Sequence, residues 1–268
     1  MGLKVDWQSA VEKILKDENI QVEMIDHECF HLLFIPNGKL ILNLVPLVQN
    51  FIPQTLISLQ QSYLQQDIQV IHLWEDIFLT KKAQVLSRIK SLLGQNKRIY
   101  GRNTTVEKIS KVEAAEFLNK FHLQGTVGAR YQYGLSYKNE LVAVGTFSNK
   151  RKMSRKGPAY TSAELVRFAT KDGITVIGGL SKLVKHYVKA LAPNDLMSYA
   201  DRDWSIGKGY ISSGFKLIAE TPPAKLYLDK DTLQRYFMHR IPNPPDSPAN
   251  PHYIEIFNTG NLKYILDL

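Results

Sequence analysis

The chain has 268 residues, with 34 Lys and Arg against 25 Asp and Glu, a formal net charge of +9 and 44% hydrophobic residues. This composition is sufficient for a buried core and excludes a disordered basic tail. Cys29 is the single cysteine, which excludes an intrachain disulfide and a cysteine cage for zinc or an iron–sulfur cluster.

The N-terminus and the longest apolar stretch predict a cytoplasmic protein that does not enter a membrane. The N-terminal segment is charged and amphipathic, without the continuous apolar run of a secretion signal. The longest apolar stretch, residues 40–47, is far shorter than the roughly 20 residues that a membrane-spanning helix needs.

The positive charge is concentrated in the middle of the chain. Residues 1–100 hold 10 basic and 10 acidic side chains, residues 101–220 hold 19 and 10, and residues 221–268 hold 5 and 5. Clustered Lys and Arg favour a polyanionic partner, because binding releases the counterions condensed on phosphates. A solvated basic surface without a partner, or an anionic cofactor, would also account for the excess.

Hydrophobic periodicity predicts an α/β (α+β) protein with two domains, 1–100 and 101–268. The elements expected in the first domain are a helix over 5–17, strands over 25–36 and 39–44, a helix over 54–66, a strand over 67–74 and a helix over 80–94. The Asn37-Gly38 step predicts that the first two of these strands form a hairpin. Residues 95–105 are interpreted as a polar, basic connector.

The second domain begins with a short strand and a helix within residues 106–122, followed by a hairpin that turns at Lys138-Asn139. Next come a strand over 163–170, a helix over 180–191, a strand over 195–201, a short helix, and strands over 215–220 and 225–229. A Pro-rich extension over 241–251 precedes a terminal hairpin, which we expect to turn at residues 259–261.

A glycine pair stands at the start of the helix over 180–191. The free N–H groups and the dipole of such a helix start can accept a phosphate, which makes Ile177, Gly178, Gly179 and Leu180 the candidate cofactor-binding residues. Two adjacent glycines are as often simply a tight turn.

Residues 103–230 resemble the GNAT superfamily of acyltransferases in the order of their elements. The layout ends with Tyr210 four residues before the pair Gly214-Phe215. In that family the turn at the helix start cradles the pyrophosphate of acyl-coenzyme A, and the Tyr often protonates the departing thiolate. The resemblance implies acetyl-CoA or a related acyl-CoA as the cofactor, although residues 175–179 replace the usual basic, glycine-spaced loop.

Within that superfamily the chain is most similar to the phage Mom proteins, which modify adenine bases in DNA. The matching segments are residues 121–125, 164–168 and 198–202, and Leu123 stands where the family has Tyr. The catalytic residues that the resemblance implies are His122, Arg167, Ser198, Asp201 and Tyr210.

The residue types suit this chemistry. A neutral His can take a proton from an amine, and an Asp can orient or activate it. Arg167, flanked by Val166 and Phe168 on a strand, suits bidentate binding of a carboxylate or phosphate. Structural roles are open alternatives: His122 ending a helix, Arg167 pairing with Glu164 or Asp201, and Tyr210 packing in the core.

The loop over residues 149–158 adds five positive charges between two strands. Trp204, near two further basic residues, could stack on an unpaired base, although a buried Trp is the commoner case. The candidate nucleic-acid-binding residues are Lys150, Arg151, Lys152, Arg155, Lys156, Arg202, Trp204 and Lys208.

Residues 30–44 and 70–76, followed by a basic helix, resemble the central part of PD-(D/E)XK nucleases of the very-short-patch-repair and phage homing type. In those enzymes an Asp and a Glu on neighbouring strands hold the metal that activates water. The corresponding positions are Leu32 and Asn43, which lack the carboxylate oxygens that Mg²⁺ prefers. We therefore expect no metal site and no nuclease activity, and interpret this domain as a degenerate scaffold or protein-interaction module.

We hypothesise a phage or mobile-element protein that binds DNA and transfers an acyl group to a nucleobase amine. The altered glycine loop and the missing carboxylates favour an alternative, a catalytically inactive DNA-binding or assembly protein that retains both folds. Acylation of a small molecule or a protein amine is a third hypothesis, which predicts no steep salt dependence of DNA binding. The expected partners are DNA and a protein bound through residues 1–100.

Overall fold

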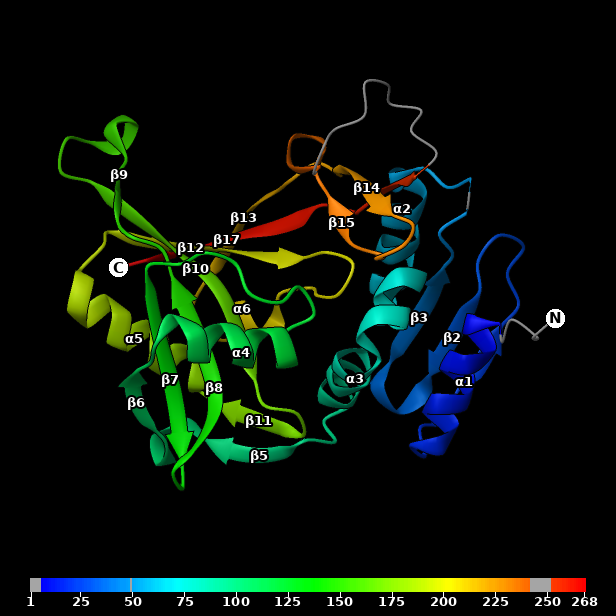
Figure 1. Ribbon diagram of the computed structural model, residues 1–268, viewed down its shortest axis with the longest axis horizontal. Helices are drawn as coiled ribbons and strands as arrows, with labels where there is room; N and C mark the ends of the chain where they lie inside the picture. Colours follow the sequence, from blue (N-terminus) through cyan, green and yellow to red (C-terminus); the bar gives the residue numbers. More distant parts are fainter. Residues whose placement is uncertain (1–5, 49, 242–251) are drawn as a thin grey trace. The chain divides into compact units, whose positions relative to one another are not determined.

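The computed structural model describes residues 6–48, 50–241 and 252–268 (Figure 1). Helices and mixed sheets occur throughout these ranges, which confirms the α/β (α+β) class predicted from the sequence. No helix in the described part of the chain is both long and apolar enough to cross a membrane.

The chain divides into two compact units. Unit 1 comprises Met1–Lys82, Asp201–Ile206 and Glu220–Asn261, and unit 2 comprises Ala83–Ala200, Gly207–Ala219 and Leu262–Leu268. The units differ from the expected consecutive domains 1–100 and 101–268, because two later segments of the chain return to unit 1. Helix α3 (Glu75–Leu92) passes from one unit to the other and has non-helical backbone at Lys81.

Unit 1 contains a four-stranded sheet in the order β1-β2-β3-β4. Its central strands form the predicted hairpin, which turns through a short 3-10 segment and places Lys39 in the left-handed region at φ 46°. Strand β4 pairs parallel with β3 after the crossover helix α2. The bounds are α1 Trp7–Asp17, β1 Glu23–Ile25, β2 Leu32–Ile35, β3 Leu40–Val45, α2 Pro53–Leu64 and β4 Gln69–Trp74.

A second sheet of unit 1 shows that the predicted terminal hairpin is wrong. Strand β16 (Tyr253–Phe257) pairs with β14 (Lys225–Asp229), which also pairs with β15 (Arg235–Tyr236). Strand β17 (Asn261–Asp267) instead lies in the sheet of unit 2. The local sequence signal for a hairpin is therefore overridden, because β16 and β17 each pair with a strand that is distant in the sequence. Most of the predicted Pro-rich extension, residues 242–251, lies outside the described residues.

Leu32 and Asn43, the positions that the resemblance compared with the nuclease carboxylates, lie opposite each other in the β2–β3 register and are buried. The Asn43 amide lies 3.1 Å from His72 Nδ1, and His72 Nε2 lies 3.1 Å from the Leu56 carbonyl oxygen. Because a carbonyl only accepts, Nε2 carries the ring proton and Nδ1 accepts from the amide. Both positions therefore belong to a packed interior, and the lack of nuclease activity stays a prediction.

Acidification is expected to destabilise unit 1 through His72. Burial lowers the pKa of His72 from 6.5 to about 3, so the folded protein keeps the ring neutral while the unfolded chain is protonated below pH 6.5. Folding stability should therefore fall as the pH drops from 6.5 toward 3, by about 1.4 kcal/mol for each pH unit. Urea unfolding of the wild type and of His72→Gln at neutral and mildly acidic pH measures this, with the exposed His239→Gln as control. An unchanged slope in H72Q would contradict the assignment.

Unit 2 is built around one long mixed sheet in the order β13-β17-β12-β10-β8-β7-β6, with β9 (Arg151–Lys152) added beside β10. The elements follow the chain order predicted from the sequence, including the hairpin at Lys138-Asn139, where both residues have positive φ. The bounds are β6 Thr105–Lys108, β7 Tyr131–Tyr137, β8 Glu140–Phe147, β10 Thr161–Thr170, β12 Asp195–Asp201 and β13 Lys216–Glu220.

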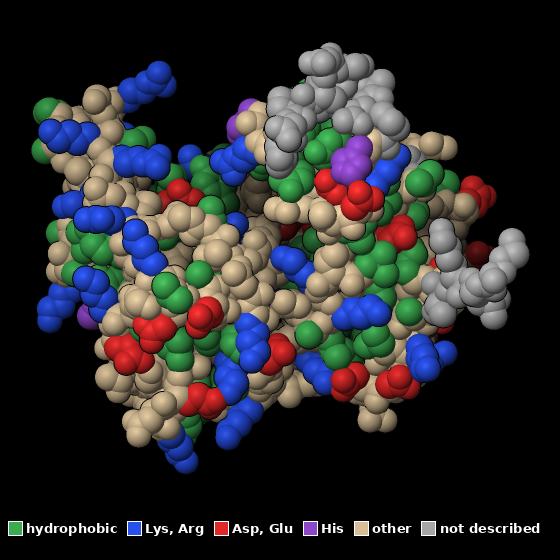
Figure 2. All heavy atoms as spheres, viewed as in Figure 1, with side chains coloured by type: hydrophobic (Ala, Val, Ile, Leu, Met, Phe, Trp, Pro, Cys, Tyr) green, Lys and Arg blue, Asp and Glu red, His purple; other side chains and the backbone are tan. Residues whose placement is uncertain are grey.

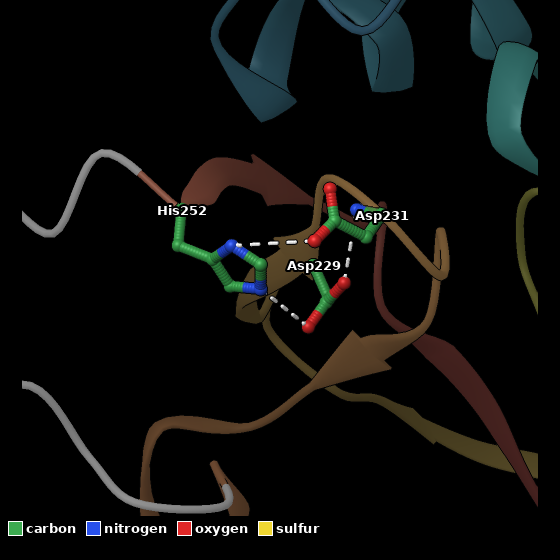
Figure 3. A group of neighbouring side chains, drawn as sticks. All are labelled: Asp229, Asp231 and His252. Carbon is green, nitrogen blue, oxygen red and sulfur yellow. Dashed lines mark hydrogen bonds and ion pairs between the residues drawn. The ribbon is translucent and has the colours of Figure 1, made fainter.

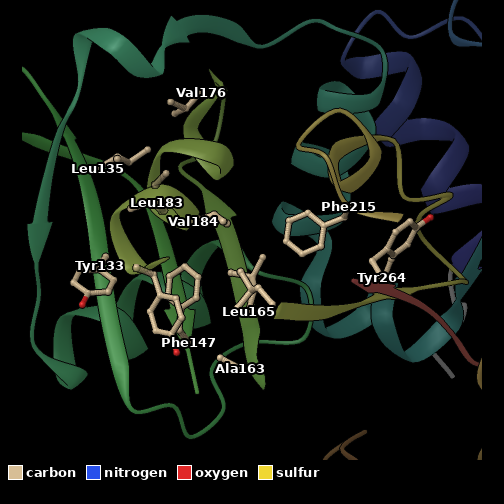
Figure 4. Close-up of a cluster of buried hydrophobic side chains, with 14 of the residues drawn as sticks. Tyr133, Leu135, Phe147, Ala163, Leu165, Val176, Leu183, Val184, Phe215 and Tyr264 are labelled. Atoms are coloured by element: carbon tan, nitrogen blue, oxygen red, sulfur yellow. The ribbon is translucent and has the colours of Figure 1, made fainter. Parts of the chain in front are cut away.

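Helices α4 (Lys111–Phe121) and α5 (Gly179–Leu191) cover opposite faces of this sheet. Val144 of β8 packs in the cluster of α4, whereas a Cβ on the next residue, Gly145, would lie 3.0 Å from Leu183 of α5. Neighbouring strand residues point to opposite faces, so one helix lies on each. The larger core cluster lies on the α5 side (Figure 4).

A short parallel pair, β5 (Lys97–Tyr100) with β11 (Ile174–Ile177), replaces the predicted connector. Ile99 and Val176 are its buried residues, and the rest of β5 is exposed. The pair matters for the site because the two strands end together, directly before Gly101 and Gly178.

Candidate functional site

Strands β10 and β12 part from each other in the middle of the unit 2 sheet. They run parallel and pair over three residues, from Ser162 with Asp195 to Glu164 with Met197. Both strands continue beyond these pairs, but the described ladder between them ends there. Beyond Glu164, therefore, the described backbone groups of β10 are not paired with β12.

A β-bulge lies at the same place in β10. The register with β8 shifts between Leu165 and Arg167, so Val166 is the extra residue. A bulge re-aims the side chains that follow it. Arg167 Nε donates to the Gly125 carbonyl oxygen at 3.3 Å, and its Nη1 donates to the Val166 carbonyl oxygen at 3.0 Å. The half-buried Arg167 therefore links the loop after α4 to the bulge in β10 through these two hydrogen bonds.

The side chains of Ser198 and Tyr210 are in contact near the place where strands β10 and β12 separate. Ser198 Oγ lies 2.9 Å from the Leu165 carbonyl oxygen and 3.1 Å from Tyr210 Oη. The carbonyl only accepts, so it takes the single proton of Ser198, and the Tyr210 hydroxyl is the donor in the second bond. Tyr210 is carried by α6 (Lys208–Ile211), and its ring stacks on Tyr264 at 5.1 Å. The tyrosine proton is thus held next to the parted strands.

Three charged side chains act on the Tyr210 hydroxyl. Burial raises the pKa of Tyr210, while the hydrogen bond with Ser198 and the charges of Arg167 and Arg88 oppose that rise, and Glu164 adds to it. The hydroxyl therefore keeps its proton at neutral pH, which is the state that a general acid requires.

Glu164 is the carboxylate of this group. Its side chain is half-buried, and burial raises its pKa against the opposing charges of Arg151 and Arg167. A half-buried carboxylate with a raised pKa suits a general base. The sequence interpretation considered Glu164 only as a structural partner of Arg167, so this role was missed.

His122 lies at the C-terminal end of α4, which is the structural role that the sequence left open for it. Its Nδ1 accepts from the Gln124 N–H at 3.0 Å, and its carbonyl oxygen accepts from the Gly125 N–H at 2.9 Å. Since Nδ1 is the acceptor nitrogen of the neutral ring, Nε2 carries the proton. In this state the Nδ1 lone pair of His122 accepts the Gln124 N–H, and the residue shapes the loop to which Arg167 donates.

Three of the predicted site residues belong to unit 1. Asp201 ends β12, and its Oδ1 accepts from the Asp203 N–H at 3.0 Å. Arg202 pairs with Glu220, and only 11% of its side chain is exposed. Trp204 is 6% exposed, so stacking on a base, the role predicted for it, does not fit, because the ring is already covered by protein.

The start of α5 is open to a ligand. Gly178 occupies the N-cap position with φ 72°, no side chain caps the helix, and a Cβ built on Gly178 would meet no atom within 4 Å. The first N–H groups of the helix have no intrahelical acceptor. At Gly179 a Cβ would lie 2.8 Å from Val176 Cγ1, so glycine allows the helix to pack closely against β11.

Arg102 is a basic residue beside this helix start that the sequence interpretation missed. A Cβ on the preceding Gly101 would lie 3.1 Å from the Gly178 carbonyl oxygen, which places the two glycines in contact. Arg102 is exposed, with its guanidinium over the Tyr100 ring at 5.0 Å. The nearby Lys182 Nζ is already bound to the carbonyl oxygens of Gly101 and Thr104. Arg102 is thus an exposed basic residue next in sequence to the glycine that contacts Gly178.

The basic loop extends from β9 into a short 3-10 segment, Ser154–Lys156. Lys and Arg side chains gather over this part of unit 2, at the upper left of Figure 2. Lys156 pairs with the buried Asp195 at 2.8 Å and therefore has a structural role. The remaining predicted binding residues of unit 2 are exposed or half-buried: Lys150, Arg151, Lys152, Arg155 and Lys208.

A separate group in unit 1 brings together Asp229, Asp231 and His252, with ligand atoms within 4.8 Å of one another (Figure 3). Asp229 Oδ1 accepts from the N–H groups of Asp231 and Thr232, and its Oδ2 lies 2.9 Å from His252 Nε2. The backbone hydrogen bond from Thr232 is the main reason that the pKa of Asp229 is lowered to about 2. These bonds account for the group as the cap of the turn after β14.

Four of the five predicted catalytic residues, His122, Arg167, Ser198 and Tyr210, thus belong to unit 2 and are linked through the β10 bulge and the split. Glu164, Arg88 and Arg102 join them as residues that sequence reasoning passed over.

No protein-family model and no curated protein matches the sequence. Solved structures similar to the chain include a Bacillus subtilis acetyltransferase in complex with CoA, with 17% identity over 62% of this chain and 99% of that one, at a TM-score of 0.38. A GNAT family acetyltransferase from Elizabethkingia anophelis with acetyl-CoA bound has 14% identity over 62% and 99%, at 0.37. An IAA acetyltransferase from Bacillus cereus has 14% identity over the same shares, also at 0.37. Likenesses of this strength assign neither an activity nor a ligand to the chain.

Proposed function

We propose that unit 2 transfers an acyl group from acyl-CoA to an amine. The observation that carries the proposal is the Tyr210 hydroxyl held by Ser198 at the mouth of the parted strands β10 and β12, with the half-buried Glu164 beside it. A proton donor and a proton acceptor near each other are the groups that amide formation from a thioester requires.

The residues around the start of α5 fit the phosphates of CoA. Uncapped N–H groups at a helix N-terminus bind anions, and the space in front of Gly178 leaves room for one. Arg102 adds a positive charge at the adjoining strand end. When bound, acyl-CoA supplies the thioester carbon that the amine attacks and the thiolate that leaves.

Two side chains move the protons in this scheme. Glu164 removes a proton from the acceptor amine, whose nitrogen then forms a bond to the thioester carbon as the carbon–sulfur bond breaks. Tyr210 gives its proton to the departing sulfur, so the products are an amide and the CoA thiol. One proton passes in total from the amine to the sulfur, and solvent returns Glu164 and Tyr210 to their starting states.

For the acceptor we propose a nucleobase amine in DNA. The whole excess of positive charge lies in residues 101–220, and the exposed Arg151 of the basic loop acts electrostatically on Glu164. A basic loop beside the base suits a polyanionic substrate, whose base must leave the stack to be modified. Under this proposal residues 1–100 serve as a scaffold or as the surface for a protein partner.

Calorimetric titration of the full chain with CoA and with pantetheine tests the cofactor. CoA should bind at least about 10-fold more tightly than pantetheine, since each hydrogen bond to a charged group contributes about 1.5–3 kcal/mol. Arg102→Met should weaken CoA alone, and the exposed Arg130→Met should change neither. Equal affinity for the two ligands, or no binding of CoA, would overturn the proposal and favour the catalytically inactive alternative.

A further inference from the structure

Strand β13 (Lys216–Glu220) forms one edge of the unit 2 sheet, and among the described residues no strand pairs with its outer side. Every residue of the strand is exposed, and the adjacent Leu217 and Ile218 are 48% and 50% exposed. Neighbouring strand residues point to opposite faces, so both faces of β13 are open as well as its outer side. An exposed strand edge with apolar side chains is a template for pairing with another strand.

The two edges of this sheet differ in how they are protected. Half of the residues of the opposite edge strand, β6 (Thr105–Lys108), are charged, which discourages pairing. Strand β13 carries its charges only at its ends, Lys216 and Glu220, with Leu-Ile-Ala between them. Pro222 and Pro223 follow, and because proline has no N–H they keep a pairing from extending beyond the strand.

The backbone of β13 presents alternate residues to a partner on its outer side. Directly after the strand, the Thr221 N–H donates to the carbonyl oxygen of Asn261, the first residue of β17, at 2.8 Å. Thr221 therefore faces β17, and the direction of the hydrogen-bonding groups alternates along a strand. It follows that Lys216, Ile218 and Glu220 direct their N–H and C=O groups away from β17.

The sequence of β13 is complementary to itself in the antiparallel direction. When two copies are related by a two-fold axis at Ile218, Lys216 of each copy lies opposite Glu220 of the other. The two Ile218 residues lie opposite each other between these charges, and Leu217 lies opposite Ala219 on the other face. Opposite charges and apolar pairs stabilise strands as cross-strand neighbours, whereas a parallel pairing would place like charges opposite each other.

We propose that β13 is the interface of a two-fold symmetric homodimer, in which the unit 2 sheets of two copies join through this strand. The inference does not depend on acyl transfer. Such an interface uses the same patch on both copies and therefore closes at the dimer. A single pair of strands is a small interface, so we expect a weak dimer that forms as the protein concentration rises.

The ion pairs that the two end residues already make are compatible with this pairing. Lys216 Nζ lies 3.4 Å from Asp267, and the two side chains are 76% and 66% exposed, so water screens the pair. Glu220 bonds to Arg202 through one carboxylate oxygen, and its side chain is 50% exposed. A carboxylate has two oxygens and can accept from two cations.

Sedimentation velocity of the full chain at increasing concentration tests the dimer. Ile218→Lys should raise the dissociation constant at least about 10-fold, because it places two ammonium groups opposite each other in the centre of the interface. Its urea midpoint should stay close to that of the wild type, since the side chain is exposed. Val112→Lys, at a residue of α4 that is 66% exposed, is the matched control and should leave the dissociation constant unchanged. A wild type that stays monomeric up to about 1 mM, or that assembles beyond the dimer, would overturn the proposal.

Cysteine cross-linking tests the register, in a Cys29→Ser background that removes the native cysteine. Hydrogen-bonded residues directly opposite each other have Cα atoms about 5.5 Å apart, which suits a disulfide. The two Leu217 residues of the dimer are offset by two positions along the strands and lie beyond the roughly 7 Å limit for a disulfide. With a mild oxidant, Ile218→Cys should therefore give a covalent dimer on a non-reducing gel, and Leu217→Cys should not. Equal cross-linking of the two variants, or none in I218C while the wild type dimerises, would overturn β13 as the interface.

Discussion

Replacing Arg235 by Met is expected to lower the free energy of unfolding by about 3–5 kcal/mol. Arg235 Nε and Nη2 donate to the two carboxylate oxygens of Asp76 at 2.6 and 2.7 Å, and the Asp76 side chain is 1% exposed. The guanidinium also lies over the Trp74 ring at 5.3 Å. Without Arg235, Asp76 would be an uncompensated charge in the interior of unit 1. Urea unfolding at neutral pH measures the loss.

Lys39→Met is the matched control. Lys39 and Asp67 form an ion pair of similar length, 2.7 Å, but their side chains are 64% and 76% exposed. Water screens such a pair, so the control should cost less than about 1 kcal/mol. The double variant Asp76→Asn with Arg235→Met should recover part of the stability, because the buried charge is then gone. A cost for R235M as small as that of the control would show that Asp76 is not held as a buried carboxylate.

Glu164→Gln is expected to lower the rate of acyl transfer by about 10²–10⁴-fold while acetyl-CoA still binds. The amide has nearly the shape of the carboxylate but cannot take a proton from the amine. Because burial raises the pKa of Glu164, activity of the wild type should rise with pH through that pKa, and this acidic limb should disappear in the variant. Initial rates of CoA thiol release across pH measure both effects.

Glu140→Gln provides the comparison for this substitution. Glu140 is an exposed glutamate of the same unit, paired with Lys171 at the start of β8, and its replacement should leave the rate unchanged. If E164Q kept the wild-type rate and pH profile, another group would be the base. Wild-type activity retained in Tyr210→Phe would likewise exclude Tyr210 as the acid.

Local signals in the sequence predicted local structure well. The Asn37-Gly38 and Lys138-Asn139 turns and the helix after Gly178 lie where their residues indicate. The terminal hairpin failed, because β16 and β17 each pair with distant strands and belong to different units. Strand β5 was missed since its charged residues show no alternation, and its partner β11 follows far along the chain.

The same contrast applies to the site residues, some of which are close together in the sequence while others come from distant segments. The family resemblance indicated Ser198 and Tyr210, which are close in sequence and meet at 3.1 Å. Arg88 comes from a helix far upstream, and nothing in its own sequence neighbourhood distinguishes it from other surface arginines. Trp204 could not be placed because its burial depends on segments of unit 1 that assemble from separate parts of the chain. Such residues are recognised only when the chain is folded.

Mass spectrometry of nucleosides from DNA incubated with the full chain and acetyl-CoA tests the proposed acyl transfer most directly. We predict an acetylated nucleoside that requires both the protein and acetyl-CoA, and that is strongly reduced with Glu164→Gln but not with Glu140→Gln. Unmodified nucleosides from the wild-type reaction, under conditions in which both CoA and DNA bind, would contradict the account.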